Sequence, residues 1–140
     1  MIDVELGALL ADASQSAAYF VDVRDRAAVV EAATALDFHV ATANLATADD
    51  KAALLAEVAE ALEFPGDFGG NWDALADSLG DLSWLGAPGY LLLIDHCGDL
   101  REDAPEDFAT LLDILDEAAR VHAGQGVPFW AVLPVATPDH

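Results

Sequence analysis

Residues 64–79 of the chain read Phe64-Pro-Gly-Asp-Phe-Gly-Gly-Asn-Trp-Asp-Ala-Leu-Ala-Asp-Ser-Leu79. The first half is rich in glycine, proline and aspartate, which predicts a loop. The second half begins at Asn71, a favourable N-cap residue, and has the apolar spacing of a helix. At about 100° per residue, Trp72, Leu75 and Leu79 fall on one side and form the predicted buried face. The stretch therefore predicts a loop followed by a short amphipathic helix, which ends near Gly80 as a C′ residue.

Acidic residues on another side of this helix are the second feature of the stretch. Asp73 and Asp77 lie four residues apart, and like charges at this spacing cost a helix about 0.2–0.5 kcal/mol. The positive helix N-terminus offsets this cost for Asp73 but little of it for Asp77. Glu63 and Asp67 upstream and Asp81 downstream enlarge the acidic patch. Two carboxylates can accept bidentate hydrogen bonds from arginine as a phosphate does, which favours a partner with a phosphate-binding pocket.

On both sides of this stretch, short β-like runs alternate with helical runs, a pattern typical of α/β domains. Strands are predicted at 18–23, 39–45, 90–94 and 129–133, and helices at 4–11, 24–36, 47–62, 71–80 and 105–122. Thr47, with Asp50 three residues later, is predicted to cap the third of these helices. The continuous apolar run over 90–94 is typical of a parallel strand that is covered on both faces. The chain is therefore predicted to be one globular α/β unit with a mostly parallel sheet.

The composition describes an apolar core inside a strongly acidic surface. The 140 residues are 54% hydrophobic, and 26 Asp and Glu outnumber 5 Lys and Arg, which gives a net charge of −21. Such a charge repels nucleic acid and anionic membranes and attracts a cationic partner at low salt, although solubility alone would also explain it. The single cysteine, the lack of a basic leader and the lack of a membrane-length apolar run predict a soluble cytoplasmic protein.

Patterns typical of catalysis or metal binding are absent from the sequence. The histidines have no ligand spacing, and no phosphate-binding loop or dinucleotide fingerprint occurs. Asp95, His96 and Cys97 are consecutive on an extended run, so their side chains point in alternate directions and do not form a nucleophile with its base. Asp73 and Asp77 would form an acid–base pair only if their pKa values diverged, for which the sequence offers no reason. We therefore expect no enzymatic activity, no cofactor and no metal.

The run Gly69-Gly70-Asn71-Trp72-Asp73-Ala74-Leu75-Ala76-Asp77 resembles the barstar family, whose pattern is Gly-x-Asn-x-Asp-Ala-Leu-x-Asp after an aromatic-containing loop. The resemblance covers residues 39–133 and implies a barstar-like α/β fold, with a three-stranded parallel sheet packed by helices. It divides the chain into a barstar-like domain at 39–140 and an N-terminal helix, strand and helix at 1–38 packed on the same unit. The strand of this addition is expected to join the sheet at an edge.

The resemblance also implies a function. Barstar-like proteins are intracellular inhibitors of secreted, barnase-type ribonucleases, and their inhibitory helix inserts an aspartate into the phosphate site of the enzyme. That aspartate matches Asp77, and a contacting glutamate of a later helix matches Glu117. The implied partner is thus a basic, extracellular-type ribonuclease. The residues expected to bind it, taken by position, are Asp67, Asn71, Asp73, Ala76, Asp77, Gly80 and Glu117.

The chain departs from the family at the rim of this site. Asp67, Ala76 and Leu82 stand where barstar carries aromatic contact residues, and Gly80 replaces a threonine. Aromatic anchors usually dominate interface energies, so their loss favours a basic nuclease other than barnase. Three alternatives stay open: an immunity or regulatory binding module for a different basic protein, an acidic enzyme that uses Asp73 and Asp77, and a domain whose charge serves only solubility.

Overall fold

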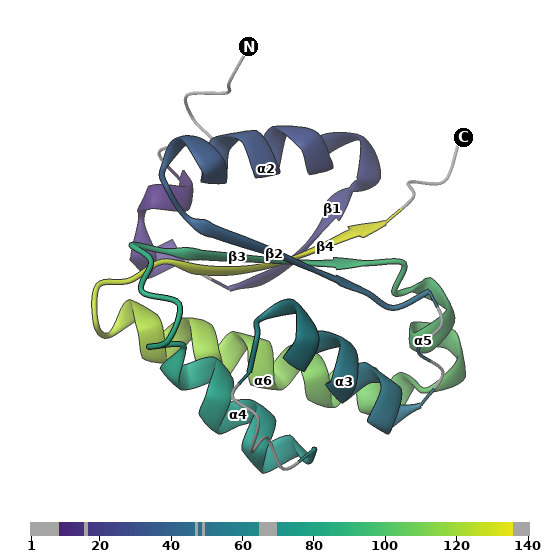
Figure 1. The fold of residues 1–140 in the computed structure, drawn as a ribbon. Coiled ribbons are helices and arrows are strands. Elements are labelled where there is room, and N and C mark those ends of the chain that lie inside the picture. The colour runs from purple at the N-terminus through teal and green to yellow at the C-terminus, as the bar shows by residue number, and fades with distance from the viewer. Residues whose placement is uncertain (1–8, 16, 47, 49, 65–69, 136–140) are drawn as a thin grey trace.

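The computed structural model describes residues 9–15, 17–46, 48, 50–64 and 70–135. In this part of the chain, β1 (Ala18–Asp22), β2 (His39–Asn44), β3 (Tyr90–Asp95) and β4 (Phe129–Val135) form one sheet. The strand order is β1-β4-β3-β2, and each neighbouring pair is parallel. The predicted α/β class and the parallel sheet are confirmed (Figure 1).

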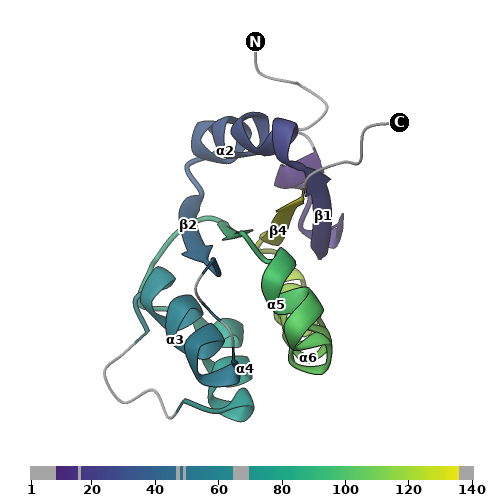
Figure 2. The ribbon, with the colours of Figure 1, turned by 90° about the vertical axis from the view of Figure 1, so that its right-hand side faces the viewer.

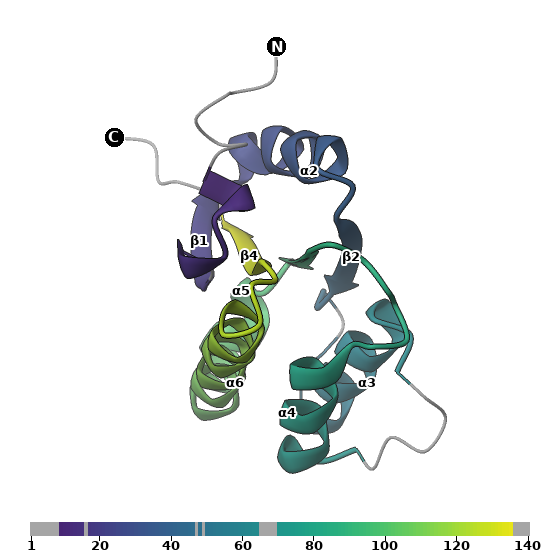
Figure 3. The ribbon, with the colours of Figure 1, turned by 90° about the vertical axis from the view of Figure 1, so that its left-hand side faces the viewer.

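Helices cover both faces of the sheet, so the molecule has three layers. Figures 2 and 3 show α2 (Arg26–Ala35) on one face, with α3 (Lys51–Ala61), α4 (Trp72–Asp81) and α6 (Pro105–Ala123) on the other. The short helices η1 (Ala13–Gln15), η2 (Val23–Asp25) and α5 (Gly98–Asp103) lie in the connections. Two apolar cores result, a larger one between the sheet and α3, α4 and α6, and a smaller one beneath α2. The site considered below lies on the side of the larger core.

The central strands show why their sequence runs are continuously apolar. Residues 90–94 of β3 and 129–134 of β4 are all buried, since helices pack on both faces of a parallel sheet. In α6, Phe108, Leu111 and Leu115 are buried. In α3, Leu54, Leu55 and Val58 are buried. Apolar patterning therefore fixes the orientation of the helices that carry the site.

The N-terminal strand joins the sheet at an edge, as expected. β1 pairs with β4 from Ala18 opposite Ala131 to Asp22 opposite Val135. The Ala18 N–H donates to Asp116 Oδ1 at 2.9 Å, and Trp130 Nε1 donates to the Leu10 carbonyl at 2.9 Å. These contacts attach the N-terminal segment to both the sheet and α6. The division of the chain at residues 38 and 39 stays a prediction.

Two predicted helix boundaries are wrong, and both have a local cause. Thr47 lies outside the described residues, and α3 begins at Lys51 because Asp50 is extended and accepts from the Ala53 N–H at 2.8 Å. Gly80 is not a C′ residue, because α4 continues to Asp81 and the left-handed residue is Leu82, with φ 52°. Burying the Leu82 side chain gains about 1.5–3 kcal/mol, which offsets the cost of about 1–2 kcal/mol for this conformation. Of the helix predicted at 4–11, only residues 9–11 are described, and they are helical.

Candidate functional site

The N-terminus of α4 is fixed by its own side-chain cap. Asn71 is extended, with φ −132° and ψ 171°, and its Oδ1 accepts from the Ala74 N–H at 2.7 Å. Gly70 before it has φ 70°, a conformation that glycine adopts without steric cost. The predicted N-cap is confirmed, and it sets the start of the helix that carries Asp73 and Asp77.

The buried face of α4 holds the helix against the larger core. Leu75 and Leu79 are fully buried, and Trp72 is half-buried with Lys51 Nζ 5.6 Å from its ring centroid. The predicted face is therefore correct for the two leucines, while Trp72 packs at the edge of the core beneath a cation. This packing turns the opposite side of α4 toward solvent.

The C-terminal end of α4 is held by two buried rings that the sequence analysis did not single out. His122 on α6 is 2% exposed, and its Nε2–H donates to the Leu79 carbonyl at 2.8 Å. Its ring stacks on Phe129 at 5.5 Å between centroids and an interplanar angle of 8°. The Tyr90 hydroxyl donates to the Leu82 carbonyl at 3.3 Å. Position 122 continues the buried spacing of Leu115 and Ala118, which was the available sequence signal.

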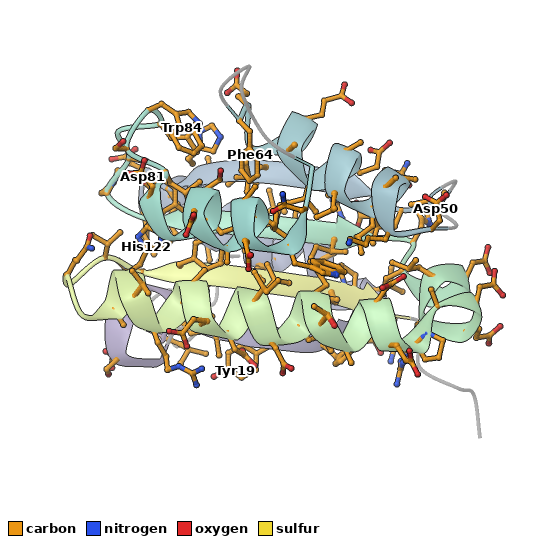
Figure 4. All side chains as sticks on the ribbon, turned by 90° about the horizontal axis from the view of Figure 1, so that it is seen from below. Tyr19, Asp50, Phe64, Asp81, Trp84 and His122 are labelled. Carbon is orange, nitrogen blue, oxygen red and sulfur yellow. The ribbon has the colours of Figure 1, made fainter. Side chains whose placement is uncertain are left out.

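Three aspartates form an exposed row on the outer side of α4, which we call the acidic row: Asp73, Asp77 and Asp81. They are spaced by one helical turn, so their carboxylates lie on one side of the helix. Among the described residues, none of the three side chains has a hydrogen bond or an ion pair. Figure 4 shows α4 and α6 from the side away from the sheet, with Asp81 at the end of α4 that lies near His122. The helix therefore presents three negative charges that no cation of the described chain neutralises.

Helix α6 lies beside α4 and contributes the seventh predicted residue. A Cβ built at Gly80 would lie 3.9 Å from Val121 Cγ1, which brings the last turns of the two helices together. Glu117 lies one turn before Val121 and has a side chain that is 61% exposed. Its Oε2 is 2.8 Å from Arg120 Nη2, and this hydrogen bond is the main cause of the raised Arg120 pKa. Glu117 is therefore near α4 but, unlike the acidic row, is already paired.

The structure places most of the predicted site residues on two adjacent helices. Asn71, Asp73, Ala76, Asp77 and Gly80 share α4, and Glu117 lies on the adjacent helix. Asp67 lies outside the described residues. Asp81, which the sequence placed in the acidic patch, lies in line with Asp73 and Asp77, and the structure adds the supporting His122 and Tyr90.

The residues at the end of β3 and just after it are paired or buried, unlike those of the acidic row. Arg26 binds Asp95 through two hydrogen bonds, Nε to Oδ1 at 3.0 Å and Nη2 to Oδ2 at 2.8 Å. Cys97 is buried, and this burial raises the pKa of its thiol. Asp95 is thus paired with an arginine, and the raised thiol pKa disfavours the thiolate, which is the nucleophilic form of cysteine.

The described residues contain no group of three or more His, Cys, Asp or Glu side chains arranged to hold a metal ion. None of the helices described is both long and apolar enough to cross a membrane.

The two side-chain N-caps give a matched pair of variants. Asn71→Ala and Asp50→Ala each remove one N-cap hydrogen bond, of 2.7 Å and 2.8 Å, and each should lower the free energy of unfolding by about 1 kcal/mol in urea denaturation. If the acidic row is the functional surface, only Asn71→Ala should also weaken partner binding, because only α4 carries that row. Equal binding losses in both variants would contradict this assignment.

Comparison with known families gives one match. A family model described as Barstar (barnase inhibitor) matches residues 38–134. The match begins just before β2 and ends within β4, so it includes α4 and α6 and excludes β1 and α2. A search of curated proteins found no match.

Proposed function

Because the chain belongs to the barstar family, we propose that it inhibits a basic, barnase-type ribonuclease by filling the phosphate-binding site of the enzyme with carboxylates of α4. The observation that carries this proposal is the acidic row, Asp73, Asp77 and Asp81, exposed and unpaired within the described chain. A cleft that binds RNA phosphates offers arginine and lysine side chains. Carboxylates at one-turn spacing would accept the charge-assisted hydrogen bonds that such side chains make to phosphate.

The support of α4 favours tight inhibition. The helix is fixed at its start by Asn71, along its inner face by Leu75 and Leu79, and at its end by His122. A surface that is already ordered loses little side-chain and backbone freedom on binding, so more of the contact energy appears as affinity. The net charge of −21 would add long-range attraction for a basic enzyme at low salt.

The proposed contact surface is centred on Asp77. It also includes Asn71, Asp73, Ala76 and Gly80 of α4, Glu117 of α6 and Asp67 of the preceding loop. Glu117 would have to exchange its ion pair with Arg120 for one with the enzyme, so we expect a smaller contribution from it than from Asp77. Occupation of the cleft would exclude RNA sterically and electrostatically, with no cofactor and no catalytic step. We place this activity in the cytoplasm, where an inhibitor would protect the producing cell.

One observation favours a second candidate, a binding module for a different basic protein. Leu82 occupies a position where barstar carries an aromatic contact residue, and its side chain is fully buried. Ala76 and Gly80 add almost no side-chain surface. The acidic centre of the surface is therefore retained without its aromatic rim, which suits a cationic target of another shape.

The test compares inhibition of purified barnase-type ribonucleases by the wild type and by the variant Asp73→Asn/Asp77→Asn/Asp81→Asn. We expect the wild type to inhibit at least one enzyme, more strongly at low salt, and the variant to lose both the inhibition and most of its salt dependence. The control Asp25→Asn/Glu31→Gln/Asp37→Asn removes the same number of exposed charges on the side of α2 and should inhibit nearly as well. Salt-dependent binding to a basic protein, with no ribonuclease inhibited, would favour the second candidate.

A further inference from the structure

Gly80 is a residue that the fold of the free protein does not explain. It lies inside α4 with the backbone in the ordinary right-handed helical region. A Cβ at this position would meet only Val121 Cγ1, at the ordinary van der Waals distance of 3.9 Å. Alanine would therefore fit, and Gly80, the last residue but one of α4, is helical, a conformation in which glycine is less stable than alanine. Since neither dihedral angles nor packing requires glycine, the missing side chain leaves room for something outside the chain.

The residue exposed by this missing side chain is apolar. Val121 on α6 is 39% exposed. Five large apolar side chains are exposed in the described chain, and Val121 is the one that lies on α3, α4 or α6. The other four, Leu9, Tyr19, Phe20 and Val23, lie in or next to η1, β1 and η2. A single exposed valine is ordinary by itself. Next to Gly80, however, it adds exposed apolar surface where α4 and α6 meet.

Charged groups lie on both sides of this apolar surface. Asp77 precedes Gly80 by three residues and Asp81 follows it, so both carboxylates lie along the same side of α4. Glu117 and Arg120 border Val121 on α6, where their ion pair is exposed to solvent. The unpaired negative charge therefore lies on the α4 side. It favours a partner that places a cation next to the group that covers Val121.

We infer that the partner approaches α4 most closely at Gly80 and seats an apolar side chain on Val121, with a neighbouring cation on Asp77 and Asp81. The inference rests on the proposed function and specifies its partner, a basic ribonuclease with an apolar side chain projecting beside its phosphate-binding cations. An apolar anchor from the enzyme would then replace the aromatic contacts that positions 67, 76 and 82 of this chain do not supply. Burial of this apolar side chain would add a contribution to the binding free energy that salt does not screen.

The test uses the full chain and a barnase-type ribonuclease that the wild type inhibits, with Tm and Kd measured for each variant. Gly80→Ala should raise Tm by about 3 °C through helix propensity and weaken binding about tenfold through steric conflict. Gly80→Leu, which covers Val121, should weaken binding about a hundredfold or more, with the salt dependence of Kd kept because Asp77 and Asp81 remain. Val121→Thr should weaken binding several-fold and make the heat-capacity change of binding less negative.

The control is Thr34→Ala on α2, across the sheet, where Thr34 is exposed and bonds only the Val30 carbonyl of its own helix. It should raise Tm and leave Kd unchanged. A lower Tm in Gly80→Ala would show that the glycine serves the fold and would overturn the inference, as would an unchanged Kd in Gly80→Ala and Gly80→Leu. Failure of the proposed function gives another result, because the wild type then inhibits no ribonuclease, and the inference fails with it.

Discussion

Asp77→Ala is expected to weaken ribonuclease inhibition by about 30- to 5,000-fold, which corresponds to about 2–5 kcal/mol of binding free energy. Asp77 is the middle member of the acidic row and has no partner among the described residues, so its carboxylate is available to the enzyme. Its removal would leave the opposing arginine or lysine desolvated and unpaired, which accounts for most of the expected loss. The free inhibitor should be unaffected or slightly more stable, because repulsion from Asp73 and Asp81 disappears.

Inhibition constants at two salt concentrations, together with urea denaturation, would check this expectation. The unfolding free energy should change by less than about 0.5 kcal/mol, as for other exposed positions. Glu31→Ala on the exposed side of α2 removes the same charge from the other face and should change inhibition only slightly. A similar loss in both variants would mean that overall charge, and not the position of Asp77, is responsible.

His122→Ala is expected to have the largest effect on stability, about 3–4 kcal/mol of unfolding free energy. The ring is 2% exposed and lies against Phe129 and Tyr90, so its removal opens a cavity in a packed region. The Leu79 carbonyl would also lose its side-chain donor at the last turn of α4, where helix carbonyls lack partners within the helix. The change should therefore loosen the end of α4 as well as the core.

A second substitution separates these two contributions. His122→Phe keeps a stacked ring and removes only the hydrogen bond, so the expected loss is smaller, about 1–2 kcal/mol. His96→Asn is the control, because His96 is exposed and asparagine tolerates its φ of 59°. Urea denaturation should rank the variants in the order Ala, Phe, control. If His122→Ala lost less than about 1 kcal/mol, the packing described around the ring would be contradicted.

The strands could be predicted from sequence because their signal is local. The apolar runs at 90–94 and 129–133 are bounded by turn residues, and both are buried central strands. The edge position of β1 followed from the resemblance of residues 39–133 to a complete barstar-like core. By contrast, α5 was not predicted, since this six-residue helix, rich in charged residues, buries only Leu100 and has no periodic apolar pattern.

The boundaries of α3 and α4 show where local signals mislead. Thr47 and Gly80 are residues of the kinds that begin and end helices, yet Asp50 and Leu82 occupy those positions. At Leu82 the deciding term is burial of the side chain against the rest of the core, which no local pattern contains.

The candidate site, too, could be predicted from the sequence only in part. The positions of Asn71, Asp73 and Asp77 follow from one short motif and helical geometry. The contact between His122 and Leu79 joins residues 43 apart, and the exposure of Val121 depends on where α6 lies beside α4. These features arise from packing between elements, so they needed the three-dimensional structure.

The position of β4 has a consequence for how the chain folds during its synthesis. β4 lies inside the sheet between β1 and β3, yet it is the last of the described strands to be synthesised. On the ribosome, β1 therefore lacks β4, its strand neighbour in the described sheet, until residues 129–135 have emerged. Pairings between such distant residues are slow to form, because the entropy of closing a long loop is lost before any contact stabilises the pair. A nascent chain would then display its acidic helix without a finished sheet behind it, and the inhibitor that we propose would start to act only after β4 has left the ribosome.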